Sequence, residues 1–240
     1  MKKTEFSQEI GRSWLHADYD EKRISFAYPP VKGTHVENYK VINADPEIVP
    51  AEGFELSLLV QGAFLGNSKQ WQDVRDRCIT ENYIRIPKRL LWIPSTHEFA
   101  GVLIENDLKG RGLSTIMNVP ESMDDWKNQD GIYFKDNMIL VPADKYALGE
   151  HNSDSYVKDG LAASVFTEEG AEIFARTAND NNKMVYNLGI DITRIVSPEQ
   201  RVAVLDSGRV RLYLGCAFLD DVRGCFSFGV RPQNFSSGNK

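Results

Sequence analysis

The feature that most constrains the fold is a series of short apolar runs that alternate with polar residues and end at turn-forming residues. Such runs stand at 23–28, 99–107, 131–134, 138–143, 183–190, 201–206, 209–219 and 225–230. A period of two is typical of half-buried strands, and strand-like runs without long helices between them disfavour a doubly wound parallel sheet. We predict an α+β, strand-rich fold of mainly antiparallel sheets with about three helices.

Four other runs are also predicted as strands, at 39–44, 53–66, 82–86 and 89–93. In GFELSLLVQGAFLG (53–66), alternation around Phe54, Leu56, Leu58 and Val60 predicts a strand with one face in the core. Pro87 stands between the last two runs, where a proline is tolerated, so it is expected to separate two strands.

Helices are predicted at 68–82, after the N-cap candidate Ser68, and at 121–127, directly after Pro120. The clearest helix is predicted at 167–180.

The start of this third helix is well marked. Thr167 is expected to be its N-cap, and Phe166 can pack on Ala171 as a hydrophobic staple. Glu168 and Glu169 stand in the first turn, where the helix dipole favours negative charge. These residues are explained by helix-start chemistry without a ligand.

Turn-forming residues at 147–160 mark the best candidate boundary. We predict a strand-rich N-terminal region, 1–150, and a small α+β domain, 151–240, with the 167–180 helix on an antiparallel sheet.

The net charge of −6 gives no electrostatic reason to bind a phosphate backbone. The best local basic cluster is Arg85, Lys88 and Arg89 beside Trp92. Three basic residues are too few to indicate a nucleic-acid site, so no nucleic-acid binding is predicted. The first residues carry two lysines but no apolar run, and LSLLV at 56–60 is far too short to span a bilayer. The sequence therefore predicts a protein without signal peptide or membrane insertion, cytoplasmic or assembled into a particle.

The cysteines, Cys78, Cys216 and Cys225, form no CxxC pair. Their odd number and wide spacing do not indicate a disulfide framework or a zinc site, and they are interpreted as buried free thiols. Pairing of Cys216 with Cys225 stays open, as does any chemical role of the three.

His16, Asp18 and Asp20 stand at alternate positions, so on a strand they would project from one face as metal ligands could. With no second histidine cluster nearby, the segment is interpreted as solvated, and no metal site is predicted.

No catalytic signature is present. The histidines available as a base are His16, His35, His97 and His151, and neither GxSxG nor HExxH occurs. Ser95, His97 and Glu98 are neighbours in sequence, which does not support a triad. The KGRG stretch at 109–112 lacks phosphate-loop spacing and is interpreted as a turn, so no cofactor is predicted and the catalytic residues stay unknown.

The stretch SVFTEEGAEIFARTANDNN, followed by RVAVLDSGRV and RGCFSFG, resembles the periplasmic head subdomain of SecD-type protein-export subunits. The matching positions are Thr167, Glu169, Gly170, Ala171, Phe174, Thr177, Asn181, Val204, Leu205, Asp206, Gly208 and Val210. The resemblance covers residues 159–230 and implies a helix packed on an antiparallel sheet. It departs from the family in the long insert after the helix, in Leu212–Tyr213–Leu214 after the hairpin and in the missing transmembrane helices.

These observations favour a non-enzymatic protein-interaction or assembly protein that self-associates or binds protein partners, as part of a virion or another large complex. The alternative is a hydrolase-type enzyme with a metal- or histidine-based site between the two halves, using His16, Asp18 and Asp20 or His97. A further alternative is a peptide-binding head related to export machinery.

Overall fold

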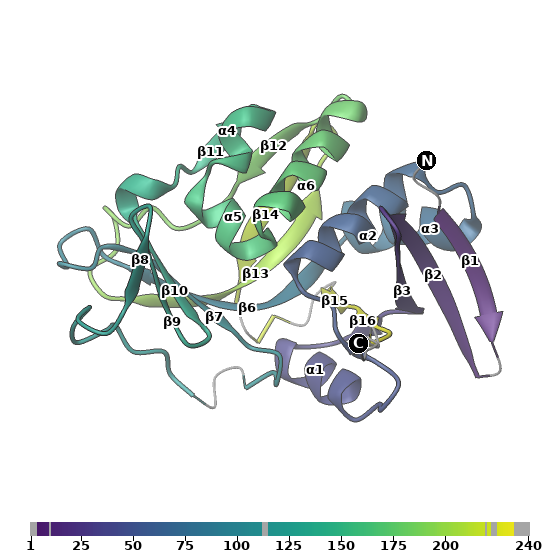
Figure 1. Ribbon diagram of the computed structural model, residues 1–240, viewed down its shortest axis with the longest axis horizontal. Coiled ribbons are helices and arrows are strands. Elements are labelled where there is room, and N and C mark those ends of the chain that lie inside the picture. The colour runs from purple at the N-terminus through teal and green to yellow at the C-terminus, as the bar shows by residue number, and fades with distance from the viewer. Residues whose placement is uncertain (1–3, 10, 112–114, 219, 222–224, 233–240) are drawn as a thin grey trace, which may run out of the picture.

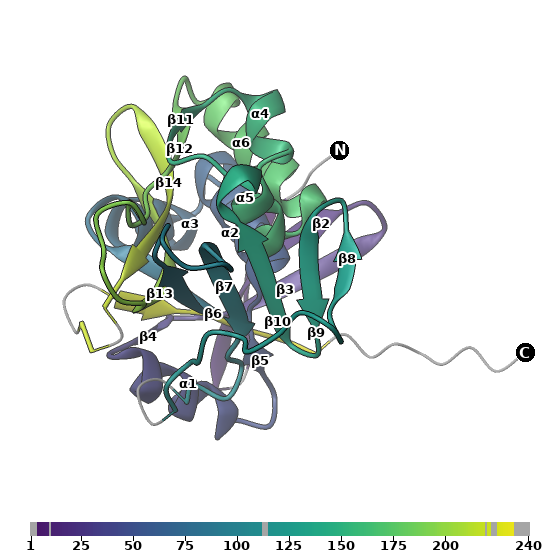
Figure 2. The ribbon, with the colours of Figure 1, turned by 90° about the vertical axis from the view of Figure 1, so that its left-hand side faces the viewer.

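The computed structural model describes residues 4–9, 11–111, 115–218, 220–221 and 225–232. Within them the chain forms two sheets and six α-helices. Figures 1 and 2 show how these elements are arranged. The predicted α+β, strand-rich class is confirmed, and the described helices are more numerous than the three predicted.

The smaller sheet, sheet A, has five described strands in the order β1-β2-β3-β16-β5. Their bounds are Thr4–Glu9 (β1), Arg12–Tyr19 (β2), Lys22–Tyr28 (β3), Gly229–Val230 (β16) and Val49–Pro50 (β5). All its pairings are antiparallel, and β16 brings residues near the C-terminus beside β3.

The larger sheet, sheet B, has eleven described strands, nine of which follow the order β11-β12-β14-β13-β6-β7-β10-β9-β8. Strand β15 pairs with β6, and β4 pairs with β15. The bounds are Gly149–His151 (β11), Met184–Asn187 (β12), Arg211–Ala217 (β14), Glu199–Ser207 (β13), Tyr83–Ile93 (β6), Gly101–Asn106 (β7), Met138–Pro142 (β10), Ile132–Lys135 (β9), Lys127–Gln129 (β8), Cys225–Ser227 (β15) and Val31–Lys32 (β4).

Most neighbours in sheet B are antiparallel, whereas β12 and β14, and β15 and β6, run parallel. Sheet B draws its strands from both sides of residue 150. The division into a region 1–150 and a domain 151–240 stays a prediction.

The helices are α1 (His35–Asn43), α2 (Gly53–Leu65), α3 (Lys69–Asp73), α4 (Ser153–Val157), α5 (Gly160–Phe166) and α6 (Glu168–Asp180). A π-helix, Val74–Thr80, continues α3, and a 3-10 turn lies at Ala143–Lys145. Figures 1 and 2 show α1 at one end of the molecule and α4, α5 and α6 at the other, with β6 and β13 between them. No helix in the described part of the chain is both long enough and apolar enough to cross a membrane.

Sheet B has two different faces. Its inner face packs on α2, α5 and α6 and forms the main core through residues such as Ile84, Ile104 and Leu205. Its outer face, away from these helices, carries Leu91, Leu103 and other side chains from the alternate positions. This alternation follows from the pleat of the strands.

The helix predicted at 167–180 is confirmed as α6. Thr167 is its N-cap and accepts a hydrogen bond from the backbone N–H of Gly170 at 3.2 Å, and Glu168 and Glu169 lie in the first turn. The helix predicted at 68–82 is present as α3 and the π-helix, with Ser68 as N-cap.

The strand predicted at 53–66 is wrong, because these residues form α2. Buried residues lie on every side of its central turns, between sheet A on one side and α5 and α6 on the other, and Leu65 at its last position is exposed. A helix that is hydrophobic on every side has no helical stripe, so its sequence also satisfies an alternating pattern.

The strand predicted at 39–44 is also wrong, because α1 occupies His35–Asn43. A capping box starts it: the Thr34 hydroxyl accepts from the N–H of Glu37 at 3.2 Å, and the Glu37 carboxylate accepts from the N–H of Thr34 at 3.0 Å. The TxxE pattern was the available signal.

Two further predictions fail. Residues 82–86 and 89–93 belong to one strand, β6, which runs through Pro87 because its register with β13 shifts there as a bulge. The predicted 121–127 helix is absent, since the Ser122 hydroxyl accepts from the N–H of Asp124 and holds a turn.

Candidate functional site

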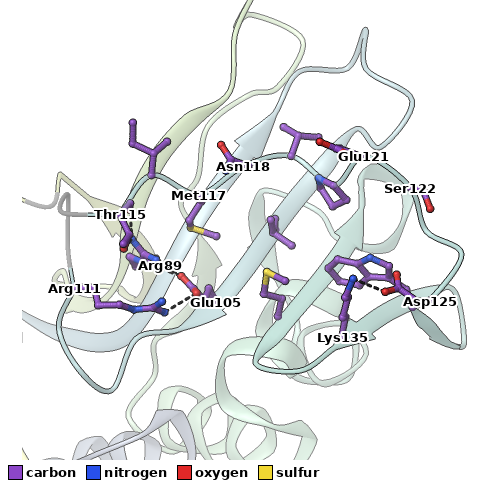
Figure 3. Close-up of a pocket in the computed structure, with 16 residues that line it drawn as sticks. Arg89, Glu105, Arg111, Thr115, Met117, Asn118, Glu121, Ser122, Asp125 and Lys135 are labelled. Atoms are coloured by element: carbon purple, nitrogen blue, oxygen red, sulfur yellow. Dashed lines mark hydrogen bonds and ion pairs between the residues drawn. The ribbon is translucent and has the colours of Figure 1, made fainter.

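A pocket of about 540 Å³ lies on the outer face of sheet B, between strands β7, β9 and β10 and the described segment 115–126 that leads to β8 (Figure 3). The side chains around it are Arg89, Leu103, Glu105, Arg111, Thr115, Ile116, Met117, Asn118, Val119, Pro120, Glu121, Ser122, Asp125, Trp126, Lys135 and Met138. We name it the strap pocket.

The floor of the strap pocket is apolar. Leu103 of β7 and Met138 of β10 come from the sheet, while Met117 and Trp126 come from the segment above it. All four belong to a hydrophobic cluster that includes Leu91 of β6 and is separate from the main core. This cluster holds segment 115–126 against sheet B. Trp126 therefore packs toward the sheet, and the segment does not form the predicted 121–127 helix.

One wall of the strap pocket is a charged network centred on Glu105, which two arginines share (Figure 3). The Arg89 Nε donates to Glu105 Oε2 at 2.9 Å, and the Arg111 Nη2 donates to Glu105 Oε1 at 2.5 Å. Arg89 is almost fully buried, and its Nη1 also donates to the Thr115 hydroxyl at 3.1 Å. Glu105 therefore neutralises the guanidinium of Arg89, which is shielded from solvent.

Asp107 forms a second layer behind this wall. It accepts from the backbone N–H of Arg111 at 3.0 Å and from the Arg111 Nε at 3.3 Å. Its other oxygen lies 3.0 Å from His35 Nε2, and both of these side chains are fully buried. The network thus connects the pocket to the first residue of α1.

Burial lowers the pKa of His35 below its usual 6.5, against the opposing effect of Asp107. The ring is therefore neutral at pH 7, and its Nε2–H donates to Asp107. Two arginines then face two carboxylates, so the network carries no net charge.

The opposite side of the strap pocket holds another ion pair, between Lys135 Nζ and Asp125 Oδ2 at 2.5 Å (Figure 3). The hydrogen bond from Lys135 lowers the pKa of Asp125. Glu121, Ser122 and Asn118 lie at the rim. Ser122 donates to Asp124 at 2.9 Å, so its hydroxyl faces no base in the pocket.

The basic cluster singled out from the sequence does not form a surface patch. Arg85, Lys88, Arg89 and Trp92 are all buried. Of these residues, Arg89 belongs to the strap pocket, whereas Arg85 donates to the backbone carbonyl of Asp221 and contacts the Cys225 sulfur at 3.2 Å.

Of the candidate metal ligands, His16 and Asp18 lie on one face of β2, whereas Asp20 lies beyond the end of the strand, in a turn with a φ of 52°. The interpretation of this segment as solvated is wrong for His16, which is buried. His16 lies between two hydroxyls, with Nε2 2.7 Å from Ser7 Oγ and Nδ1 2.9 Å from Ser25 Oγ. Asp18 pairs with Arg23 at 2.8 Å. In the described parts of the chain, no group of three or more His, Cys, Asp or Glu residues could hold a metal ion.

The other histidines lie apart from one another. His97 is in the β6–β7 loop, where its Nδ1 accepts from the N–H of Phe99 at 3.1 Å. His151 packs near Asp159, whose carboxylate caps α5 by accepting from the N–H of Ala162 at 3.0 Å. His35 alone among the four reaches the strap pocket network.

The three thiols are free, as predicted, and Cys78 and Cys225 are buried, whereas Cys216 is half-buried. Burial raises the pKa of Cys78 to about 12 and that of Cys216 to about 11, so neither is an ionised nucleophile at pH 7. Cys225 is buried, with its sulfur 2.8 Å from the Tyr83 hydroxyl. The turn predicted at 109–112 lies partly outside the described residues.

Sequence reasoning missed Glu105, Asp107, Arg111, Trp126 and Lys135. A signal was present in IEND, where Glu105 and Asp107 stand two apart at the end of an apolar strand and Arg111 follows four residues later. Comparison of the chain with protein-family models, curated proteins and solved structures found no match.

Proposed function

We propose that this chain is a non-enzymatic protein-interaction or assembly protein, and that the strap pocket receives an apolar anchor from a protein partner. The observation that carries this proposal is the internal neutralisation of the pocket wall. Glu105 and Asp107 already face Arg89 and Arg111, and Asp125 already faces Lys135.

A charged ligand that displaced Glu105 from Arg89 would leave a buried charge without its closest partner, which is costly. An apolar side chain would instead cover Leu103, Met117 and Met138 and leave the pairs intact. Full burial of a side chain of leucine size contributes about 1.5–3 kcal/mol. The pocket is therefore suited to an uncharged, hydrophobic group.

The residue types also fit a protein partner. Methionine side chains adapt to differently shaped partners, and tryptophan is enriched in the centres of interfaces. Met117, Met138 and Trp126 supply both properties at one pocket. Glu121 at the exposed rim favours an anchor flanked by a basic residue, since complementary rim charges steer association.

Selection of random phage-displayed peptides on the whole chain, followed by calorimetric titration of the enriched peptides, tests this proposal. Met138→Lys places a charge on the apolar floor and is expected to weaken binding at least about tenfold. Met138→Leu should bind like the natural chain, and Val196→Ala, at a position 97% exposed, is the matched control. Equal binding by Met138→Lys would overturn the assignment to this pocket.

The same selection tests the expectation from the SecD-type resemblance. A peptide-binding head would enrich extended peptides without an apolar anchor, and their affinity would not respond to Met138→Lys.

A second candidate function, a hydrolase, is favoured by the contacts of His16. Burial, followed by the charge of Arg23, lowers the pKa of His16, so the ring is a neutral base at pH 7 beside the Ser7 hydroxyl. A fluorophosphonate probe should then label the natural chain and spare Ser7→Ala. Absence of labelling would remove this candidate.

A further inference from the structure

A second pocket, of about 520 Å³, lies near the β13–β14 hairpin and is lined from three neighbouring strands of sheet B. Its lining residues are Thr80, Tyr186, Leu188, Asp206, Ser207, Gly208, Arg211 and Tyr213. We name it the hairpin pocket.

The strand register fixes the order of its side chains. Tyr186 of β12 stands beside Tyr213 of β14, and Tyr213 stands opposite Asp206 of β13. Arg211 is two residues from Tyr213 on β14, so it shares the face of Tyr213 and is a diagonal neighbour of Asp206. Diagonal positions of this kind are about 7–8 Å apart.

Two tyrosines and a leucine form an apolar shelf in the hairpin pocket. The rings of Tyr186 and Tyr213 meet edge to face, with their centroids 5.7 Å apart. The Arg211 guanidinium carbon lies 5.0 Å from the Tyr186 centroid. Leu188 is 53% exposed and lines the same pocket, so its side chain is accessible to a ligand.

The charges of the hairpin pocket are not neutralised by one another. Within the described residues, Arg211 has no ion pair, and its buried Nε has no hydrogen-bond partner. Asp206 accepts from the N–H of Ser207 at 2.6 Å, and no described cation pairs with it. Burial raises the pKa of Asp206, as expected for a carboxylate that lacks a cationic partner.

We propose that the hairpin pocket binds a free α-amino acid with an apolar or aromatic side chain. The ligand carboxylate pairs with Arg211, its ammonium group pairs with Asp206, and its side chain lies on Tyr186, Tyr213 and Leu188. A zwitterion supplies both missing partners at once and fits between two diagonal residues that do not reach each other. This inference is independent of the function proposed for the strap pocket.

Calorimetric titration of the whole chain with L-phenylalanine, L-leucine and L-glutamate tests the proposal. Phenylalanine and leucine should bind, and glutamate should bind more weakly because its side chain is charged. N-acetyl-phenylalanine lacks the ammonium charge and phenylalanine amide lacks the carboxylate charge. Each should bind at least about tenfold more weakly than phenylalanine. If these derivatives bind as tightly as phenylalanine, the pocket recognises a peptide terminus or an aromatic group, and the proposal of a free α-amino acid is overturned.

Asp206→Asn and Arg211→Gln should each weaken phenylalanine binding at least about tenfold. Arg209→Gln is the matched control, because it removes the same charge from an exposed position of the same hairpin that does not line the pocket. Peptide binding at the strap pocket should be unchanged in all three variants, which separates a failure here from a failure of the first proposal. Absence of phenylalanine and leucine binding to the natural chain at millimolar concentration would overturn the inference.

Discussion

The two pockets of sheet B differ in how their charges are balanced. In the strap pocket, Glu105 lies between Arg89 and Arg111, and every charge of the wall has a partner in the protein. In the hairpin pocket, Asp206 and Arg211 stand near each other without an ion pair between them.

This difference follows from burial. Arg89 is fully enclosed by sheet and segment, and an enclosed charge without a partner would destabilise the fold. Arg211 and Asp206 are only half-buried, so water can solvate them until a ligand arrives. The paired charges of the strap pocket therefore stabilise the fold and leave its apolar floor for an uncharged group, whereas the unpaired charges of the hairpin pocket are the basis for proposing a zwitterionic ligand there.

The largest expected effect is that of Glu105→Gln. Removing the carboxylate charge breaks the closest ion pair of the buried Arg89 and leaves Asp107, whose Oδ2 lies 3.8 Å from Arg89 Nε, to face both arginines, which is expected to lower the free energy of unfolding by about 3–5 kcal/mol. Urea denaturation measures this change, with Glu121→Gln at the exposed rim as the control. A loss close to that of the control would contradict the role given to the network.

A smaller effect is expected from His35→Gln, which weakens the hydrogen bond to Asp107 and should cost about 1.5–3 kcal/mol. It should also change the pH dependence. Because burial lowers the pKa of His35 in the folded chain, the unfolded chain binds more protons below pH 6.5. Stability should therefore fall as the pH falls below 6.5 towards the folded pKa.

Urea denaturation at a series of pH values between neutral and mildly acid tests this sign. The dependence of the free energy of unfolding on pH should be shallower in His35→Gln than in the natural chain. The dependence that remains in the variant should include a contribution from His16, whose pKa is also lowered by burial. Equal slopes in the two chains would show that His35 does not titrate as inferred.

The smallest effect on stability is expected at the hairpin pocket. Asp206→Asn and Arg211→Gln break no ion pair between described residues, so each should change the free energy of unfolding by no more than about 0.5 kcal/mol. The same denaturation measurement checks this. A loss as large as that of Glu105→Gln would show that the two pockets are balanced alike.

The parts of the fold that were predictable are those with a local cause. The start of α6 is encoded by Thr167 and the two glutamates that follow. The β13 and β14 runs alternate between apolar and polar residues, as is typical of strands. In each case neighbouring residues alone determine the backbone, so no distant contact is needed.

The failures lie where a distant contact determines the outcome. Residues 53–65 are mostly apolar and are buried on several sides, and only their position between sheet A, α5 and α6 makes a helix the better solution. Pro87 was expected to end a strand, yet the bulge opposite Val202 and Val204 accommodates it.

By itself the sequence determined an α+β chain with mainly antiparallel strands, free thiols and a well-capped C-terminal helix. Only the tertiary structure decided the sites. Glu105 of β7 contacts Arg89 of the neighbouring strand β6, and His35 contacts Asp107, which is 72 residues away in the sequence. Likewise, Tyr186 meets Tyr213 and Asp206 because β12, β14 and β13 lie side by side. Such meetings depend on how burial of apolar faces orders the strands, and no local pattern in the chain encodes that order.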